Sequence, residues 1–395
     1  MSIRSVRILQ VVPALETGGA ERTAVDIGAA IVERGWTSLV ASAGGRLVEQ
    51  LEREGSRHIT LPLESKSPIT LWRNATALTG IIRENGVDLI HARSRAPAWS
   101  SLLAARRCAI PFVTTYHGAY NQKNAAKAFY NSVMARADVV IANSQWTADL
   151  IGERHPSSKD RIVPIARGTD LDAFNPKTIS QEDRAKLLRQ WGVEQRENRF
   201  LIVNLARLTE WKGQRVVIEA AAQMVKSNPE VLFVLAGGDQ GRSDYSQDLR
   251  RLIARHELHS HVLLPGHCDQ PESAMAVADA VVVASIEAEA FGRAAVEAGA
   301  LERPVIVTRI GAVGETVLAP PDVGKNKRTG WKVAPGSADE MAQALREVME
   351  LPPDEREAIG RRARHRASQH FSLQAMSEKT LAIYERLLEP QTRLD

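Results

Sequence analysis

The sequence predicts an α/β protein built from two doubly wound domains, each with a parallel sheet covered by helices. Three observations lead to this prediction. With 395 residues the chain is too long for one ordinary hydrophobic core. Short β-rich runs alternate with longer amphipathic stretches along the whole chain, which is typical of parallel strands joined by helices. A polar, charge-rich stretch at 176–198 separates two such series, and we expect the interdomain linker there.

The first domain is expected at 1–175 and the second at 199–372. Candidate strands of the first domain lie at 6–13, 38–42, 88–92, 112–117, 139–144 and 161–165. Candidate strands of the second domain lie at 200–208, 231–238, 261–266, 280–284, 305–310 and 330–334. A last helical pattern at 373–388 follows both series, and the pattern alone does not decide which domain it packs against.

Composition indicates a globular protein, since 44% of the residues are hydrophobic and 25% are charged. The two cysteines, Cys108 and Cys268, lie far apart in sequence, and no basic and apolar leader opens the chain. We therefore expect a reducing, cytoplasmic compartment. No apolar run approaches the roughly 20 residues that span a bilayer, so any expected membrane contact is through the surface.

The net charge of +4 is unevenly spread. Residues 1–176 carry 21 Lys and Arg against 16 Asp and Glu, whereas the remainder carries 30 against 31. Between Leu89 and Ala137 there are seven basic residues and no acidic one. This stretch favours an anionic partner, although a set of solvated helix faces explains the charge equally well.

In the first half, Gly18 and Gly19 follow the first strand and open a helix, so their turn can present N–H groups to a phosphate. A plain tight turn is the alternative. The turn is not the G-x-G-x-x-G fingerprint, and the second strand ends without an acidic residue for a ribose, which argues against an NAD-dependent enzyme. His117 ends the fourth strand, at an edge where ligands bind, but a lone histidine is more often structural.

In the second half, Arg207 follows a strand and Lys212 begins the next helix. A cation is normally unfavourable at a helix start because the helix dipole is positive there, and a bound polyanion would remove this conflict. The two residues therefore form a candidate cationic clamp. A surface ion pair between Lys212 and Glu210 is the alternative.

The stretch from Ser285 to Ala300 contains two carboxylates and a glycine at a strand-to-helix turn. Glu289 falls at the turn, and Gly292 allows a ligand to approach the helix start closely. Glu297 lies on a helix of small apolar residues, where a buried carboxylate costs several kcal/mol, roughly, unless it has a partner such as a ligand hydroxyl. The alternative is that Glu297 faces solvent.

Residues 289–297 match the E-x-F-G-x-x-x-x-E signature of retaining GT-B glycosyltransferases of family 4, and residues 207–213 match the R-x-x-x-x-K-G pattern of that family. The resemblance covers almost the whole chain. It implies two Rossmann-like domains facing a cleft, with the helix at 373–388 packing back on the first domain. It also implies retaining transfer of a hexose from a nucleotide-diphosphate sugar of UDP or GDP type, without a metal or a further cofactor.

The resemblance also implies roles for individual residues. The catalytic residues would be Arg207, Lys212, Glu289 and His117. The donor-binding residues would be Gly18, Gly19, Gly238, Gly266, Phe291, Gly292 and Glu297, the last holding ribose hydroxyls. One departure is Arg167, which stands where the N-G-V-D turn of the family has asparagine, so the resemblance implies no ligand contact at Gly168.

The acceptor prediction rests on the acid-free stretch. Arg93 and Arg95 follow a strand end close to Trp99, and Lys123 is expected on an amphipathic helix after His117. Arginine forks suit phosphate or carboxylate, and basic residues beside aromatic ones suit an anionic lipid surface. We expect Arg93, Arg95 and Lys123 to bind an anionic glycan or glycolipid acceptor of lipopolysaccharide type at the inner membrane face. Nucleic acid is not an expected partner.

Other classes of protein remain as alternatives. A GT-B sugar phosphorylase would be much longer and would carry a pyridoxal lysine. A non-catalytic subunit that binds a sugar nucleotide would have little reason to keep the whole clamp, and a transferase with a small soluble acceptor would keep all of it. Donor turnover separates an enzyme from a binding subunit.

Overall fold

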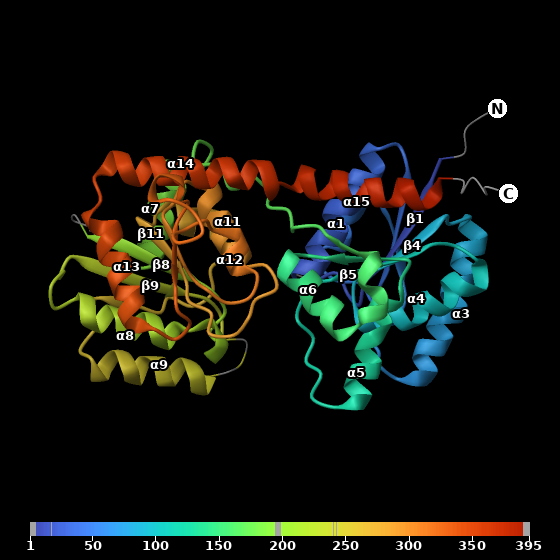
Figure 1. Ribbon diagram of the computed structural model, residues 1–395, viewed down its shortest axis with the longest axis horizontal. Helices are drawn as coiled ribbons and strands as arrows, with labels where there is room; N and C mark the ends of the chain where they lie inside the picture. Colours follow the sequence, from blue (N-terminus) through green and yellow to red (C-terminus); the bar gives the residue numbers. More distant parts are fainter. Residues whose placement is uncertain (1–4, 17, 194–198, 240, 242, 390–395) are drawn as a thin grey trace. The chain divides into compact units, whose positions relative to one another are not determined.

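The computed structural model describes residues 5–16, 18–193, 199–239, 241 and 243–389, and it divides into two compact units (Figure 1). The first unit comprises Met1–Gly168 and Leu373–Asp395, and the second comprises Thr169–Ser372. Each unit contains one parallel sheet with helices on both faces, so the expected α/β class with two Rossmann-like sheets is confirmed.

The first unit has a seven-stranded sheet in its described part, with strand order β3-β2-β1-β4-β5-β6-β7. The strands are β1 (Arg7–Val11), β2 (Thr37–Ser42), β3 (Arg57–Thr60), β4 (Leu89–Ala92), β5 (Phe112–Tyr116), β6 (Val139–Ala142) and β7 (Ile162–Pro164). The helices are α1 (Gly19–Glu33), α2 (Val48–Arg53), α3 (Pro68–Asn85), α4 (Arg95–Cys108), α5 (Ala125–Asn131), α6 (Gln145–Arg154) and α15 (Leu373–Leu388), with 3-10 turns η1 (Ser132–Arg136) and η2 (Pro156–Arg161).

The edge strand β3 is missing from the sequence-based strand list. Its sequence is Arg-His-Ile-Thr, and none of its residues is buried, because it pairs only with β2. The central strands β4, β5 and β6 are buried along their whole length, as expected for strands covered by helices on both faces. Hydrophobic periodicity therefore detects the buried centre of this sheet and not its polar edge.

Helix α15 packs within the first unit beside α1, although it is the last helix of the chain (Figure 1). Its buried Met376, Leu381 and Tyr384 belong to one hydrophobic cluster with residues of β1 and α1. The hydroxyl of Tyr384 lies 2.6 Å from Nδ1 of the buried His91. The main-chain N–H of Gly168 donates to Met376 Sδ at 3.1 Å, and a Cβ at Gly168 would lie 2.7 Å from the Cα of Leu373. Gly168 thus serves a close approach between the chain and α15.

The second unit has a six-stranded parallel sheet in its described part, with strand order β10-β9-β8-β11-β12-β13. The strands are β8 (Phe200–Leu205), β9 (Val231–Ala236), β10 (Val262–Leu263), β11 (Ala280–Val283), β12 (Val305–Thr308) and β13 (Trp331–Val333). The helices are α7 (Gln181–Gln190), α8 (Gln214–Met224), α9 (Ser243–Arg255), α10 (Pro271–Ala276), α11 (Arg293–Ala300), α12 (Val313–Thr316), α13 (Ala338–Glu350) and α14 (Pro353–His370), with 3-10 turns η3 (Glu210–Lys212) and η4 (Lys325–Lys327).

The stretch expected as a linker at 176–198 differs from that expectation where the structure describes it. Residues 176–193 belong to the second unit and contain α7, which begins at the N-cap Ser180 and buries Leu187. Arg184 anchors this helix by donating to the main-chain oxygen of Ala276 at 3.2 Å. The polar composition that suggests a linker belongs to the solvent face of α7, while residues 194–198 lie outside the described residues. None of the helices in the described part is long and apolar enough to cross a membrane.

Candidate functional site

The segment that carries Arg207 and Lys212 follows β8 and lies against the end of β11. The main-chain N–H of Ile286 donates to Trp211 O at 2.8 Å. Gly213 has a φ of 72°, and a Cβ at this position would overlap the main-chain oxygen of Ala284. A residue other than glycine would therefore push Lys212 away from β11, which is a structural reason for the Lys-Gly pair.

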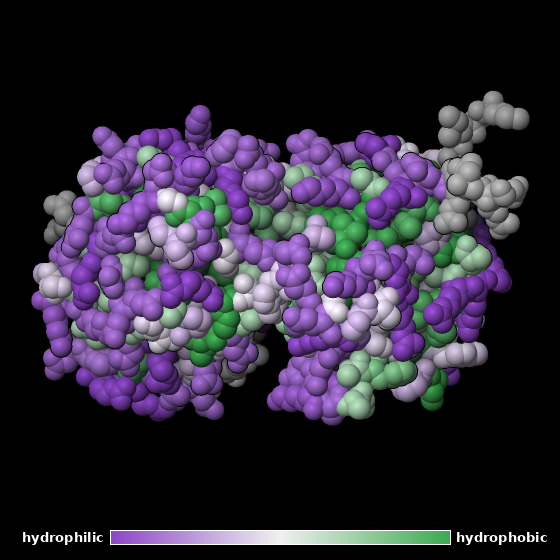
Figure 2. All heavy atoms as spheres, in the orientation of Figure 1, coloured by the Kyte–Doolittle hydropathy of each residue, from purple (hydrophilic) through white to green (hydrophobic). Residues whose placement is uncertain are grey.

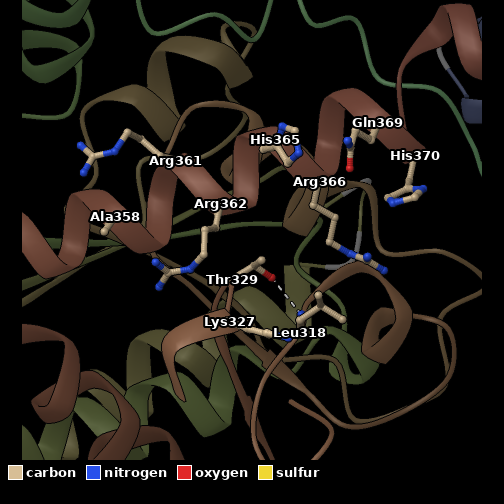
Figure 3. Close-up of a pocket in the computed structure, with 10 residues that line it drawn as sticks. All are labelled: Leu318, Lys327, Thr329, Ala358, Arg361, Arg362, His365, Arg366, Gln369 and His370. Atoms are coloured by element: carbon tan, nitrogen blue, oxygen red, sulfur yellow. Dashed lines mark hydrogen bonds between the residues drawn. The ribbon is translucent and has the colours of Figure 1, made fainter. Parts of the chain in front are cut away.

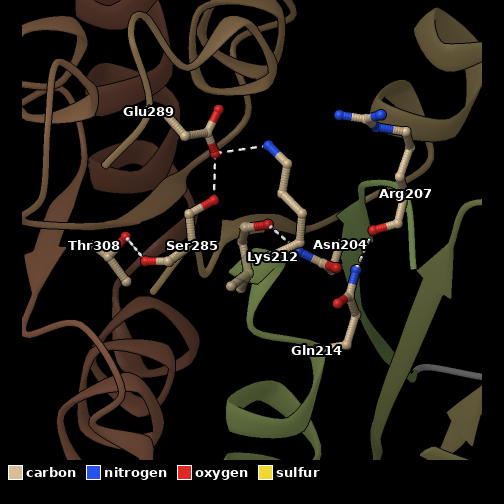
Figure 4. Close-up of polar contacts among 8 residues, drawn as sticks. Asn204, Arg207, Lys212, Gln214, Ser285, Glu289 and Thr308 are labelled. Carbon is tan, nitrogen blue, oxygen red and sulfur yellow. Dashed lines mark hydrogen bonds and ion pairs between the residues drawn. The ribbon is translucent and has the colours of Figure 1, made fainter. Parts of the chain in front are cut away.

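Lys212 forms an ion pair with Glu289. Its Nζ lies 2.8 Å from Glu289 Oε1, and the hydroxyl of Ser285 donates to the same oxygen (Figure 4). Both side chains are largely shielded from solvent, with exposed fractions of 16% for Lys212 and 12% for Glu289. The partner of Lys212 is thus a motif carboxylate of the same site. Ser285 belongs to neither charged motif, and its position two residues after the end of β11 is the signal that could have identified it.

The main chain of Glu289 is fixed by a short bridge to Gly311. Ala312 N donates to Glu289 O at 2.8 Å, and Gly311 has a φ of 62°. A Cβ at Gly311 would lie 2.5 Å from Glu289 O, so the bridge requires glycine. This bridge fixes the main chain that carries Glu289, whose carboxylate faces Lys212.

Phe291 and Gly292 build the turn into α11. Gly292 has a φ of 81° and flanks the N-terminus of the helix, and a Cβ there would lie 2.9 Å from Val313 Cγ2. Phe291 is buried, with its ring 5.6 Å from the ring of Phe371. Glu297 is also buried, with Oε1 2.9 Å from Nη2 of Arg293. Arg293 therefore supplies the partner that a buried Glu297 requires. The two residues are four positions apart on one helix, a spacing from which this pairing could have been predicted.

The turns that follow β8, β9 and β10 are joined by main-chain hydrogen bonds. Leu208 N donates to Gly238 O at 3.0 Å, and Gly237 N donates to Gly266 O at 2.7 Å. These bonds bring Gly238 and Gly266 to the strand edge that carries Arg207, whose side chain is exposed. Figure 4 shows the guanidinium of Arg207 on the same side of the strand ends as the ammonium group of Lys212.

In the first unit, the glycine turn lies against Arg167. A Cβ at Gly19 would overlap the guanidinium group of Arg167, and the main-chain N–H of Gly18 donates to the carboxylate of Glu21 in the first turn of α1. Arg167 also interacts electrostatically with His117. The structure therefore places Gly19 and His117 beside the cation of Arg167, the residue that stands where the family turn has asparagine.

His117 is neutral in this environment. Burial lowers its pKa well below the ordinary value, and the positive charges of Arg167 and Arg93 lower it further. Neither ring nitrogen has a hydrogen-bond partner among the residues that the structure describes. An imidazole in this state can donate one hydrogen bond and accept another, which suits a sugar hydroxyl.

Arg93, which the sequence led us to expect as an acceptor contact, is buried. Its side chain is only 2% exposed, and Nε and Nη2 donate to Gln10 Oε1 at 2.8 and 2.6 Å. Arg93 follows the central strand β4 directly, so its side chain enters the interior of the unit. Lys123 is exposed, as expected, but it precedes α5 and its N-cap Asn124 and so does not lie on the helix.

Arg95 lines a pocket of about 570 Å³ within the first unit. The guanidinium carbon of Arg95 lies 4.3 Å from the ring centre of Tyr120, and Nη1 donates to Asn131 Oδ1 at 2.9 Å. The lining residues are Lys66, Arg95, Ala119, Tyr120, Asn121, Lys127 and Tyr130. Three of them are cationic and none is acidic, so the pocket is suited to an anion. Lys66 lies outside the acid-free stretch, and only the fold brings it to Lys127.

Two family models match the chain. The model described as Glycosyltransferase Family 4 matches residues 17–173, and the model described as Glycosyl transferases group 1 matches residues 188–366. The matched segments contain all the candidate site residues described above. The first model covers the glycine turn and His117, and the second covers both charged motifs.

Individual relatives match nearly the whole chain. The crystal structure of a glycosyltransferase from Rickettsia africae is 34% identical, with a TM-score of 0.89 over 98% of this chain and 100% of that one. The structure of HepE from Anabaena in complex with UDP is 25% identical, with a TM-score of 0.81 over 96% of this chain and 100% of that one. A D-inositol 3-phosphate glycosyltransferase from Kineococcus radiotolerans is 26% identical over 95% of this chain and 92% of its own length.

Proposed function

Because this chain belongs to the family 4, group 1 glycosyltransferases, we propose that it transfers a hexose from a UDP-sugar to a phosphate-bearing acceptor with retention of configuration. The observation that carries the proposal is the Lys212–Glu289 pair at the strand ends, together with Arg207 and the turn at Gly292. The choice of UDP is supported by the UDP complex of HepE, which is 25% identical to this chain.

Departure of the nucleotide diphosphate builds negative charge on phosphate and positive charge on the sugar ring. Arg207 and Lys212 would stabilise the phosphate charge, each well-placed donor contributing about 3 kcal/mol to the transition state. These two side chains supply the positive charge that a metal ion supplies elsewhere, so we propose a metal-independent reaction. Glu289 would bind sugar hydroxyls and stabilise the cationic ring, and Glu297 would bind the ribose.

Retention can arise in two ways. The acceptor attacks the face from which the diphosphate leaves, or the reaction proceeds through two displacements with a covalent intermediate. We favour same-face attack, because the pair leaves Glu289 bonded to Lys212 and Ser285 and thus poorly suited as a nucleophile. His117, neutral and with buried ring nitrogens, would bind a hydroxyl of the donor sugar. The anomeric configuration of the product, followed by NMR during turnover, tests retention directly.

The acceptor would bind in the pocket lined by Lys66, Arg95 and Lys127. The guanidinium of Arg95, held in place by Tyr120 and Asn131, has the fork geometry that suits a phosphate. Removing this guanidinium leaves the donor site of the second unit intact. Its contribution can therefore be measured separately from that of the donor motifs.

The elements around this pocket expose large apolar side chains, which supports a lipid-linked acceptor. Ile69 and Trp72 of α3 are 66% and 60% exposed, and Phe129 of α5 is 61% exposed. Figure 2 shows hydrophobic atoms at the surface over the start of α3 and over α5. Apolar and basic side chains together are the features of a surface that rests on an anionic membrane. We propose that the enzyme works at the inner face of the cytoplasmic membrane.

A small soluble acceptor is the second candidate, and it is favoured by relatives named D-inositol 3-phosphate glycosyltransferases. The test begins with nucleotide sugars, of which one should release its nucleotide slowly without an acceptor. Transfer is then measured to a lipid-linked phosphate acceptor in anionic or neutral vesicles, and to a soluble sugar phosphate. We expect anionic vesicles to bind the enzyme at low salt and to support faster transfer.

Arg95→Ala should raise the acceptor KM by roughly 10-fold or more while acceptor-independent nucleotide release stays unchanged, because a charge-assisted hydrogen bond is lost only on the acceptor side. Arg106→Ala is the matched control, since Arg106 is an exposed arginine on the same helix, α4, outside the pocket. Equal effects of the two variants would contradict the acceptor assignment. Efficient transfer to the soluble acceptor without vesicle binding would replace the lipid proposal by the second candidate.

A further inference from the structure

A second pocket, of about 520 Å³, lies in the second unit between α14 and the segment that precedes β13 (Figure 3). Its lining residues are Leu318, Lys327, Thr329, Ala358, Arg361, Arg362, His365, Arg366, Gln369 and His370. None of the residues of the donor motifs lines it. All of the lining residues belong to the second unit, so the pocket is complete within one compact part of the chain.

One face of α14 forms a wall of this pocket. The lining positions 358, 361, 362, 365, 366, 369 and 370 recur every three or four residues, which places them along one stripe of the helix. An adjacent stripe, with the buried Gly360 and Ala363, packs against the region of α11. A Cβ at Gly360 would overlap the main-chain oxygen of Glu302, and the Cβ position of Gly299 lies 3.3 Å from Ala363 Cβ. Small residues thus pack the helix against the region of α11, while the basic stripe faces the pocket.

Two arginines of the stripe reach across the pocket toward the opposite segment (Figure 3). Arg362 Nε donates to Arg328 O at 2.9 Å, and Arg366 Nη2 donates to Glu315 O at 2.7 Å. These main-chain oxygens fix the direction of each guanidinium group but cancel none of its charge. Arg366 Nε is buried without a partner among the described residues. Burial lowers the pKa of both groups, and neighbouring arginines lower that of Arg362 further.

No carboxylate of the pocket lining neutralises the positive charge of its arginines and lysine. Glu357 pairs with Arg361 at 3.2 Å from the preceding turn of α14, and Glu315 interacts electrostatically with Arg366. Neither of these two acidic residues lines the pocket. The lining itself therefore contains three arginines, one lysine and two histidines, with no acidic residue. Such a concave and one-signed lining concentrates an anionic ligand.

We propose that this pocket binds a ligand carrying two or more phosphate groups, at a site separate from the donor and acceptor sites. The preset guanidinium forks of Arg362 and Arg366 match the geometry of phosphate oxygens, and Lys327 adds a third positive charge from the opposite wall. The pocket volume suits a small molecule or a lipid headgroup. Both sources share the same phosphate chemistry.

The test uses a pair of matched double variants of the full chain. Lys327→Ala with Arg362→Gln removes two lining charges, and the amide nitrogen of the introduced glutamine can reach the position of Arg362 Nε and keep the bond to Arg328 O. Lys325→Ala with Arg356→Gln removes the same two residue types from the same segments, η4 and α14, outside the lining. Equal thermal unfolding of both variants and the wild type establishes that the fold is intact. Lys327→Ala alone, at an exposed position, serves if the double variant unfolds.

Tripolyphosphate is titrated calorimetrically in the presence of saturating UDP, and in parallel the protein is sedimented with vesicles of phosphatidylcholine, with and without cardiolipin, whose headgroup carries two phosphates. We expect one of the two probes to bind, with binding at least about 10-fold weaker in the lining variant and unchanged in the control variant. Tripolyphosphate binding that shows this pattern identifies a soluble ligand, and vesicle binding that shows it identifies a headgroup. If neither probe binds, or if both variants lose binding equally, the proposal is overturned.

Discussion

The two units hold their motif residues in different electrostatic states. In the second unit each motif carboxylate has a cationic partner, since Glu289 pairs with Lys212 and Glu297 pairs with Arg293. In the first unit the two arginines that follow β4, Arg93 and Arg95, donate hydrogen bonds to neutral amide side chains. Arg93 donates to the amide of Gln10, and Arg95 lies over the ring of Tyr120 and donates to an asparagine.

This difference indicates two ways of preparing a binding site. Paired charges in the second unit keep each other in position before a ligand arrives, and a ligand must compete with one partner for the other. In the first unit, Asn131 and the ring of Tyr120 orient the guanidinium of Arg95 without cancelling its charge, so an anionic ligand in the pocket meets its positive potential. The activity and stability of the second unit are therefore expected to be more sensitive to loss of one partner of a pair. Those of the first unit are expected to be more sensitive to changes in pH and salt.

The largest expected effect follows from breaking the pair in the second unit. Glu289→Gln removes the negative charge that Lys212 faces and should lower kcat by roughly 100-fold to 1,000-fold, the range seen when one preorganised group at a developing charge is lost. Lys212→Ala should lower kcat at least as much. It should also reduce stability, because it leaves a carboxylate that is only 12% exposed without its cation.

A double-mutant cycle measures the coupling within the pair. Lys212→Ala combined with Glu289→Gln should cost much less stability than the two single changes added together, because the double variant leaves no uncompensated charge. Glu287→Gln is the control, as Glu287 is an exposed carboxylate in the same loop, two residues before Glu289. Full activity of Glu289→Gln in a folded protein would contradict a catalytic role of the pair.

The pair also marks what the sequence can and cannot predict. The pattern of residues 207–213 predicts that Lys212 lies near an anion, because a lysine at a helix start is unfavourable alone. The pattern does not predict that the anion is Glu289, because Glu289 lies 77 residues away in sequence and is brought to Lys212 by the pairing of β8 with β11 and by the bond between Trp211 and Ile286. Arg293, by contrast, is four residues from Glu297, and helix periodicity alone predicts that pairing.

The first unit also contains a side-chain contact that the local sequence does not predict. Its buried strands are predicted by apolar runs, but the burial of Arg93 is not, because an arginine in a charge-rich stretch is normally exposed. It is buried because it follows β4 in the centre of the sheet, where the amide of Gln10 from β1 accepts two of its hydrogen bonds. Side-chain partners that come from other strands depend on sheet order, and local sequence does not contain that order.

A smaller effect is expected from the polar contact that holds the last helix in the first unit. Tyr384→Phe removes the hydroxyl that lies 2.6 Å from His91 Nδ1 and leaves a fully buried imidazole nitrogen without a partner. The expected cost is about 1–3 kcal/mol in the free energy of unfolding. Burial raises the pKa of Tyr384 to about 12, so the hydroxyl stays protonated at neutral pH and can donate this bond.

Tyr245→Phe in the second unit is the matched change. The hydroxyl of Tyr245 donates to Gln214 Oε1 over a longer distance, 3.3 Å, and it is only partly buried. Its loss should cost about 0.5 kcal/mol or less. Hydrogen exchange of peptides from α15 and β4 should report the first change and leave the second unit protected. Equal destabilisation by both changes would show that burial of the polar group does not decide the cost.

The last expected effect is the pH dependence of the first unit. His58, His91, His117 and His155 all belong to this unit, and burial lowers the pKa of each, most strongly for His91 and His117. A histidine with a lowered pKa binds its proton more readily after unfolding. The stability that its neutral form provides is therefore complete above the ordinary histidine pKa near 6.5 and is lost as the pH falls below it.

We expect the free energy of unfolding of the first unit to fall by on the order of 1 kcal/mol or more between about pH 7 and pH 5, measured by urea denaturation with hydrogen exchange to locate the change. His117→Gln keeps a donor and an acceptor but cannot take up the proton, so its profile should be flatter than that of the wild type. His259→Gln, at an exposed position of the second unit, should leave the profile unchanged. Parallel profiles for the wild type and His117→Gln would mean that His117 gains no proton on unfolding, and the contrast between the two units would then rest on Arg93 and Arg95 alone.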